Sequence, residues 1–416
     1  MGPLDNLESI PQPDGAPLVG NAFTVDASRL IQELMALAEE HGPIFKLEVM
    51  GNTLVFISGA DMVAEACDEK RFDKTVRGPL KRLRLIAGDG LFTGDTDDPN
   101  WSKAHHILLP SFSQKAMGSY LPMMQDIASQ LMLKWERTNS DDVIDVPKDM
   151  IRLTLDTIGV CGFGYRFNSF YREDFHPFIE ALNRTLSTTQ QMRGLPGEKL
   201  LKGAQIKQLH RDAAYMNNLV DEIIKERRNT DGDGPSDLLD FMLSGRDAQT
   251  GERLSDENIR FQINTFLIAG HETTSGLLSF TLYYLLKNRH VLQRAYAEVD
   301  EVLGRNIDQP PSLQQIGQMP YIRAILLEAL RLWPTAPAFG LAPFEDEVIG
   351  GKYAIPKGTF TTVLIPSLHR DKCVWGEDPE AFNPENFMGD AEATRDPAAY
   401  KPFGNGQRAC IGRQFA

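Results

Sequence analysis

The spacing of apolar residues along the chain predicts a mainly helical protein. Over most of the sequence, apolar side chains recur every three or four residues, which places them on one face of a helix. No repeat with a period of about 20–50 residues is present, so the sequence excludes a solenoid. The pattern predicts helices at Ser28–Glu40, Pro122–Thr138, Ile151–Cys161, Pro177–Arg193, Gln205–Arg228, Asn258–Asn288, His290–Leu303 and Tyr321–Leu332.

Two short stretches predict strands. Residues 42–59, GPIFKLEVMGNTLVFISG, form two apolar runs around a turn at Met50–Asn52. Glu347–Pro366 is a second strand-rich stretch, divided by glycine and proline. The expected fold class is therefore mainly α with a small β subdomain around 43–60 and 345–366, within one domain covering 1–416. Two polar breaks, Arg193–Gly203 and Asn229–Asp237, follow long helices, and the first is a candidate lid.

Composition narrows the class of protein. The 416 residues are 42% hydrophobic and 24% charged, which is typical of a globular chain. A net charge of −14 argues against nucleic acid as a partner, since binding it requires a basic surface. The first residues lack the charged-then-apolar pattern of a signal peptide, and the most apolar run, GLLSFTLYYLL, is shorter than the ~18 residues of a transmembrane segment. Four scattered cysteines without C-x-x-C spacing favour a reducing compartment, so we expect a cytoplasmic protein.

One cysteine differs from the others in its context. Cys67, Cys161 and Cys373 are expected to be ordinary small apolar residues. Cys410 lies in FGNGQRACIG, where Gly404 and Gly406 can form tight turns and leave no side chain in front of a flat ligand. The residues after Cys410 can begin a helix, whose N-terminal N–H groups would favour the thiolate. A thiolate is a strongly donating axial ligand for haem iron.

The longest predicted helix contains FLIAGHETTSG, for which two interpretations are open. In the first, the Thr273 hydroxyl bonds the carbonyl of Ala269 in its own helix. In the second, Ala269 and Gly270 leave space beside a cofactor, and Glu272 and Thr273 supply a carboxyl and a hydroxyl for proton transfer.

Two further pairs stand at helical spacing. Glu328 and Arg331 lie on one helix face among leucines and isoleucine, so we expect a buried pair that needs complete hydrogen bonding. The alternative is an exposed ion pair worth about 0.3–0.5 kcal/mol. Trp101 and His105 are one helical turn apart, as on any half-buried amphipathic helix.

These motifs together resemble the cytochrome P450 haem-thiolate monooxygenases. Phe403, Gly406, Arg408, Cys410 and Gly412 match the haem-ligand pattern F-x-x-G-x-R-x-C-x-G. The resemblance implies the cytochrome P450 fold, with haem b bound through Cys410 to its iron. It also implies that Phe403 packs near the thiolate and that Arg408 bonds a haem propionate.

The resemblance assigns roles to the other motifs too. Trp101 and His105 would donate to the propionates, and Glu272 with Thr273 would deliver protons during oxygen activation. Glu328 and Arg331 match the structural E-x-x-R clamp. In the family the third member of this clamp is an arginine; here the segment is PENF, and Asn386 brings a hydrogen bond without a charge.

The whole chain looks most like the haem domain of the self-sufficient fatty-acid hydroxylases, in stretches such as HHILLPSFSQKAM and FLIAGHETTSGLLSF. Those enzymes fuse the haem domain to a diflavin reductase that carries FAD and FMN and oxidises NADPH. The resemblance implies O2 as co-substrate, an apolar small-molecule substrate and a reductase partner. Because the chain stops six residues after Cys410, it is expected to be a fragment of a longer protein.

Substrate recognition departs from the closest pattern. Asn52 and Phe56 stand where an arginine and a tyrosine would anchor a fatty-acid carboxylate, so Arg77 is the candidate replacement, unless it is only part of a solvated basic face. A fatty alcohol or amide therefore remains an alternative to a fatty acid. The resemblance places these residues along the substrate cavity, although each equally fits an ordinary core: Leu80, Leu83, Ile86, Ala87, Phe92, Ile268, Ala269, Ala336 and Ala338.

Two rival functions use the same cysteine loop. A haem-binding sensor or carrier would not need the Glu272–Thr273 pair, and peroxide-driven relatives tend to lack it. The presence of this pair therefore favours a monooxygenase. The resemblance implies hydroxylation of medium- to long-chain fatty acids or related apolar chains near the chain end.

Overall fold

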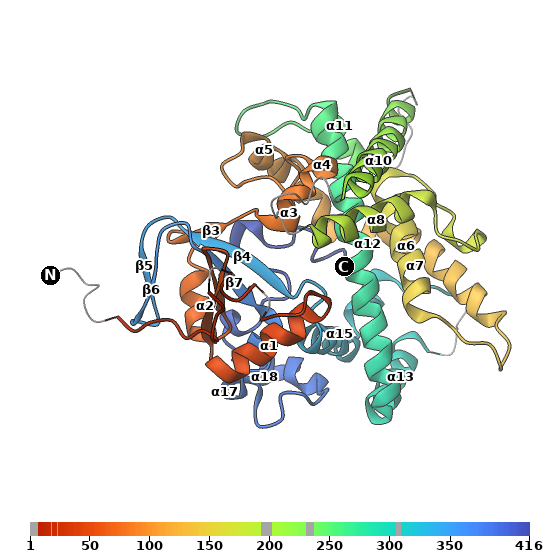
Figure 1. Cartoon of the computed structure of the whole chain (residues 1–416). Coiled ribbons are helices and arrows are strands. Elements are labelled where there is room, and N and C mark those ends of the chain that lie inside the picture. Colours follow the sequence, from red (N-terminus) through yellow and green to blue (C-terminus); the bar gives the residue numbers. More distant parts are fainter. Residues whose placement is uncertain (1–6, 18, 23, 193–201, 230–236, 305–308) are drawn as a thin grey trace. The chain divides into compact units, whose positions relative to one another are not determined.

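The computed structural model describes residues 7–17, 19–22, 24–192, 202–229, 237–304 and 309–416. Contacts within the chain gather in two compact units (Figure 1). Unit 1 comprises residues 1–75 and 280–410, and unit 2 comprises 76–279 and 411–416. The proposed lid at 193–203 lies almost wholly outside the described residues, as does the connector between 229 and 237. Whether the two units form one domain, as the sequence predicts, stays a prediction.

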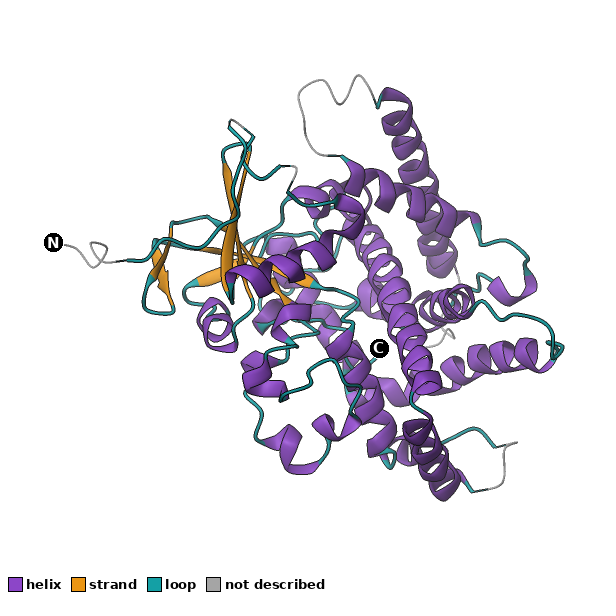
Figure 2. Ribbon diagram, turned by 60° about the horizontal axis from the view of Figure 1, so that its bottom comes forward, coloured by secondary structure: helices purple, strands orange, loops and turns teal. Residues whose placement is uncertain are grey.

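Unit 1 contains all the strands of the described chain (Figure 2). The predicted pair is β1 (Ile44–Val49) and β2 (Asn52–Ile57), which pair antiparallel with Phe45 opposite Phe56. Three more strands complete a sheet of order β1-β2-β7-β4-β3, in which β7 runs parallel to β2. A separate hairpin pairs β5 with β6. The remaining strand bounds are β3 Phe72–Lys74, β4 Ala338–Pro343, β5 Glu347–Ile349, β6 Tyr353–Ile355 and β7 Phe360–Leu364.

Helices α1 and α2 pack against this sheet, and the other helices of unit 1 lie between its later strands and the cysteine loop or precede them in the sequence. Apolar residues of the sheet and of α2 form one core, which includes Val63, Phe72 and Val363. The second core packs α1 against β1 and β2 through Leu34 and Phe45. The bounds are α1 Leu30–His41, α2 Ala60–Ala66, α13 Arg289–Leu303, α14 Leu313–Gly317, α15 Pro320–Leu332, α16 Ile365–Leu368, α17 Lys372–Trp375 and α18 Gly389–Ala393.

The regular elements of unit 2 in the described residues are all helices (Figure 2). A large core cluster draws on α4, α5, α7, α8, α10, α11 and α12. α12 is the longest helix and continues past Ser279 into unit 1. The bounds are α3 Gly78–Arg82, α4 Arg84–Ala87, α5 Pro99–Leu108, α6 Gln114–Glu136, α7 Val146–Phe163, α8 Pro177–Gln191, α10 Gly203–Asn229, α11 Leu238–Ser244 and α12 Asp256–Lys287.

The predicted fold class, mainly helical with a small sheet, is confirmed, and most helix limits agree within a few residues. The start of α6 differs most, because Ser113 caps the helix by accepting the N–H of Ala116 and the helix continues through Pro122. Among the described residues, no helix has both the length and the apolarity that a membrane crossing requires.

Candidate functional site

The cysteine loop of unit 1 closes on itself through backbone hydrogen bonds. The Cys410 N–H donates to the Phe403 carbonyl at 2.8 Å, and the Ala409 N–H donates to the Gly406 carbonyl at 3.1 Å. Gly404 and Gly406 have φ of 77° and 59°, the left-handed region that favours glycine. The Cys410 side chain is exposed, so the loop presents its sulfur outward. The predicted glycine turns are thus confirmed.

The same loop is anchored to the segment after α2. The backbone N–H of Gln407 donates to Glu69 Oε1 at 2.7 Å, and the Asn405 amide donates to the Cys67 carbonyl at 2.8 Å. A Cβ at position 406 would collide with the Glu69 carboxylate, so a side chain there would displace Glu69 from its bond to Gln407. Glu69 was not predicted from the sequence, because nothing local marks it as a neighbour of a loop more than 300 residues away.

Two cations of unit 1 lie close together beside this loop. Burial, together with the nearby Arg408 guanidinium, lowers the pKa of Lys74 to about 7. Two positive groups held together in a partly buried place suit an anionic ligand, and the carboxylates of haem supply such charges. The exposed Cys410 thiol and these cations therefore fit a haem. Lys74 carries no signal in the sequence that would have singled it out.

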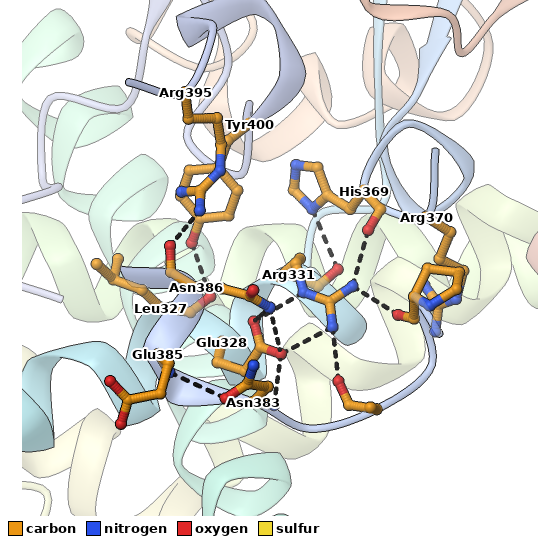
Figure 3. Close-up of polar contacts among 12 residues, drawn as sticks. Leu327, Glu328, Arg331, His369, Arg370, Asn383, Glu385, Asn386, Arg395 and Tyr400 are labelled. Carbon is orange, nitrogen blue, oxygen red and sulfur yellow. Dashed lines mark hydrogen bonds and ion pairs between the residues drawn. The ribbon is translucent and has the colours of Figure 1, made fainter. Parts of the chain in front are cut away.

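The expected clamp is present and fully buried (Figure 3). The Arg331 guanidinium donates to both Glu328 oxygens at 2.7 Å. Its remaining N–H groups donate to the carbonyls of His369, Pro379 and Ala381. A buried ion pair is tolerated only with such complete hydrogen bonding, so the alternative of an exposed pair is wrong.

Asn386 occupies the third position of the clamp as the sequence indicated. Its side-chain amide donates to the two Glu328 oxygens at 3.2 and 3.4 Å, a neutral contact only. The structure adds a second guanidinium, that of Arg395, which donates to the Asn386 carbonyl (Figure 3). Arg395 stacks 4.3 Å above the Trp375 ring and 4.7 Å above the Phe387 ring. The clamp thus acquires its additional cation from outside the PENF segment.

His369 connects the clamp to the cysteine loop (Figure 3). Its Nδ1–H donates to the Arg331 carbonyl at 3.1 Å, and its Nε2 accepts the backbone N–H of Lys401 at 3.0 Å. Burial lowers the pKa of His369 to about 3, so the ring is neutral and can both donate and accept. The segment that leads into the loop is therefore held by the end of α15.

In unit 2, α12 positions the predicted proton-transfer pair. The Thr273 hydroxyl donates to the Ala269 carbonyl at 2.7 Å, which is the local bond of the first interpretation. Glu272 lies at an exposed position of α12, and the surrounding protein still removes enough water from its carboxyl to raise the pKa of that group. Gly270 faces Ile158 of α7, where a Cβ would approach to 3.3 Å, so it serves helix packing. The proton-transfer role of Glu272 and Thr273 stays a prediction.

The aromatic pair on α5 is stacked. The rings of Trp101 and His105 lie 5.1 Å apart at 21°. The Trp101 indole N–H donates to the Leu91 carbonyl at 3.2 Å. A propionate contact would require the indole to exchange or share this bond, and the roles of both residues stay predictions.

The predicted substrate residues fall into two groups. Leu83, Ile86, Ala87 and Ile268 are buried in the main core of unit 2, with Leu80 packed against it, while Phe92 is 38% exposed. Ala336, Ala338 and Ala269 are at least partly exposed. Among the other candidates, Arg77 is exposed where α3 begins, Asn52 donates to the carbonyls of its turn, and Phe56 is stacked in the core on Phe45 at 4.9 Å.

A mainly helical chain that presents a cysteine from a glycine-turn loop, backed by a buried Glu–Arg clamp, defines a haem-thiolate protein. A family model described as cytochrome P450 matches residues 10–416. The chain therefore belongs to the cytochrome P450 family.

Similar proteins share nearly the whole of this chain. It is 54% identical over 413 residues to a bifunctional cytochrome P450/NADPH–P450 reductase of Bacillus cereus, covering 99% of this chain and 38% of that protein. It is 53% identical over 414 residues to the bifunctional cytochrome P450/NADPH–P450 reductase 1 of Bacillus subtilis, covering 99% of this chain and 38% of that protein. A self-sufficient cytochrome P450 monooxygenase, CYP505E3 of Aspergillus terreus, is 44% identical over 415 residues, covering 99% and 39%. The chain thus spans about two fifths of the length of these relatives.

Proposed function

We propose that this chain is the haem-binding part of a monooxygenase that hydroxylates medium- to long-chain fatty acids or related apolar chains near the chain end. The reaction converts R–H, O2, NADPH and H⁺ into R–OH, H2O and NADP⁺. Electrons pass from NADPH to the haem through FAD and FMN of a diflavin reductase; the names of the bifunctional relatives include an NADPH–P450 reductase. When bound through a thiolate, haem supplies the oxidising power that an unactivated C–H bond requires.

The observation that carries the proposal is the Cys410 loop. Its closing bond to Phe403 and its two positive-φ glycines hold the sulfur in an exposed position. Arg408 and Lys74 bind the carboxylates of the group, and the clamp with His369 keeps the loop in place. Each of these contributions belongs to residues of unit 1.

Residues of unit 2 have a different task. Glu272, whose pKa is raised by partial desolvation, holds a proton more readily than a fully solvated carboxyl, and the Thr273 hydroxyl can pass one on. Phe92 is an exposed aromatic group that limits which carbon of the chain is presented for reaction. Arg77, exposed at the start of α3, binds a carboxylate where Asn52 and Phe56 cannot.

The proposal is tested with the haem-loaded chain and an added diflavin reductase. The reduced CO complex should show the strongly red-shifted Soret band of thiolate ligation, and Cys410→Ala should abolish it. NADPH-dependent hydroxylation of dodecanoic to hexadecanoic acid and of the matching alcohols identifies the substrate class. Arg77→Ala should weaken the binding of the acids and leave the binding of the alcohols unchanged. An unshifted Soret band, or no oxygenated product from any of these chains, would overturn the proposal.

A haem-binding sensor or carrier is the second candidate, favoured by the bond that already satisfies the Thr273 hydroxyl within its helix. NADPH consumption matched by product formation excludes it. Location in the cytoplasm stays a prediction.

A further inference from the structure

We propose that Gln262 and Asn258 of α12, together with Asp89, are specificity-determining positioning residues. They fix the loop 88–94, and this loop aims the Phe92 ring at the substrate. The inference rests on the proposed function, because it assumes that Phe92 meets the substrate. It adds three polar residues, none of which faces the reacting atoms, to those that decide where a chain is hydroxylated.

A buried chain of hydrogen bonds runs from α12 to this loop. The fully buried Gln262 accepts the Leu91 N–H on Oε1 at 3.0 Å and donates from Nε2 to Asn258 Oδ1 at 3.1 Å. Asn258 donates in turn to Asp89 Oδ1 at 2.8 Å, and Asn100 donates to Asp89 Oδ2 at 2.7 Å. A buried polar network in which each member has a partner makes a segment rigid and specifies one conformation.

The residue after Phe92 is held as firmly as the one before it. The buried Thr93 hydroxyl donates to the Gly88 carbonyl at 2.8 Å, and Arg84 Nε donates to the Thr93 carbonyl at 2.8 Å. The Thr93 N–H donates to the Gly90 carbonyl at 3.0 Å. With the bond from Trp101 to the Leu91 carbonyl, the N–H and C=O groups on both sides of Phe92 are bonded.

The loop also lies directly against α12. A Cβ at Gly88 would collide with the Phe261 ring, and one at Gly90 would collide with the Thr265 hydroxyl and lie 3.0 Å from the Phe261 carbonyl. At Gly88 and Gly90 the loop therefore packs against α12 too closely to admit a side chain. Because the backbone at Leu91 and Thr93 is fixed, the direction of the Phe92 Cα–Cβ bond is fixed as well.

This arrangement has a consequence for the reaction. Phe92 is 38% exposed, and the position of its ring depends on the direction that its backbone gives to the Cα–Cβ bond. Displacements near 1 Å are enough to change which atom of a bound chain is presented. Loss of the Leu91–Gln262 bond should therefore broaden the set of carbons hydroxylated.

The probe variant is Gln262→Met, which keeps the length of the side chain and removes its polar atoms. Hydrogen exchange at the Leu91 amide should become about tenfold faster, the factor expected for one lost hydrogen bond. The hydroxylation of hexadecanoic acid should spread to more chain positions. Thr154→Val is the matched control, since the Thr154 hydroxyl donates a buried bond to the His271 carbonyl of α12 at 2.8 Å, and its other acceptors lie on its own helix, α7. It should leave both measurements unchanged.

Three outcomes separate the inference from the function on which it rests. If Phe92→Val redistributes the products and Gln262→Met does not, the inference is overturned while the function stands. If wild type gives no product, the function fails, and the exchange measurement still decides whether Gln262 holds the loop. If Gln262→Met does not fold, Asp89→Asn, which keeps one acceptor, should give the same changes at smaller amplitude, and unchanged exchange in that variant refutes the proposal.

Discussion

Arg395→Ala should destabilise unit 1 by about 2.5 kcal/mol, because Arg395 supplies the additional cation of the clamp. Its guanidinium lies 4.3 Å from the Trp375 ring and 4.7 Å from the Phe387 ring, contacts worth about 1 kcal/mol together. Its bond to the Asn386 carbonyl is charge-assisted and adds about 1.5 kcal/mol. Thermal unfolding should show the loss as a fall of about 5 °C in the midpoint.

A sharper test asks whether a cation at position 386 can replace the cation of Arg395. Asn386 already contacts Glu328, and the charge of Arg395 also acts on this carboxylate. Asn386→Arg in the Arg395→Ala background therefore places a cation beside the same group and should restore at least half of the lost stability. In the wild-type background the same change brings a further guanidinium beside Arg395 and should give no gain. Such non-additivity is the signature of two positions that share one partner.

The matched control is Arg323→Ala, which removes an exposed ion pair with Glu392 whose oxygens lie 2.7 and 2.9 Å away. It should cost less than about 1 kcal/mol. The reasoning is refuted if Arg395→Ala costs no more than this control, or if Asn386→Arg has the same effect in both backgrounds.

Three further outcomes are expected. Gly406→Ala should reduce haem retention severalfold, measured by transfer of haem to apomyoglobin, because its φ of 59° is strained and its Cβ meets Glu69. The free energy of unfolding should fall as pH drops below about 6.5, because burial lowers the pKa of His271 to about 4 and of His369 to about 3. Each ring takes up a proton when the protein unfolds, and each fully titrated ring reduces the stability by roughly 3 kcal/mol or more. Urea titrations from pH 7 to 4 measure this loss, and a stability that does not change with pH would contradict it. Thr273→Val should increase the peroxide formed per NADPH while leaving the CO spectrum intact, whereas unchanged coupling would remove Thr273 from proton transfer.

Local patterns were enough to predict most of the helices and the first two strands. Capping, apolar spacing and turn residues act within a few positions, so α8, α10, α12 and α13 lie within a few residues of their predicted limits. β3 and β4 were missed because β3 has three residues and β4, AFGLAP, lacks apolar–polar alternation. Their existence depends on pairing with distant segments and not on their own composition.

The residues of the candidate site also differ in whether local sequence predicts them. The Cys410 loop was predictable because its glycines, arginine and cysteine stand together in the sequence. Glu69, Lys74 and His369 reach that loop only through the folded chain, and no local spacing links them to it. The same holds for Gln262, whose partner Leu91 lies far away in the sequence. The shift of the clamp cation to Arg395 likewise follows from tertiary packing.

The sheet of unit 1 also has a consequence for how the protein is made. β2 and β3 belong to the first 75 residues, but their neighbours β7 and β4 begin only at Phe360 and Ala338. At roughly 5–20 residues per second, a nascent chain waits tens of seconds before these strands can pair. During that time the helical residues of unit 2 are already available to fold, while β2 and β3 present open edges that invite wrong partners. The thiolate loop, which contacts both early and late segments, can be assembled only at the end of this process, so incorporation of the cofactor is bound to be a late step in biogenesis.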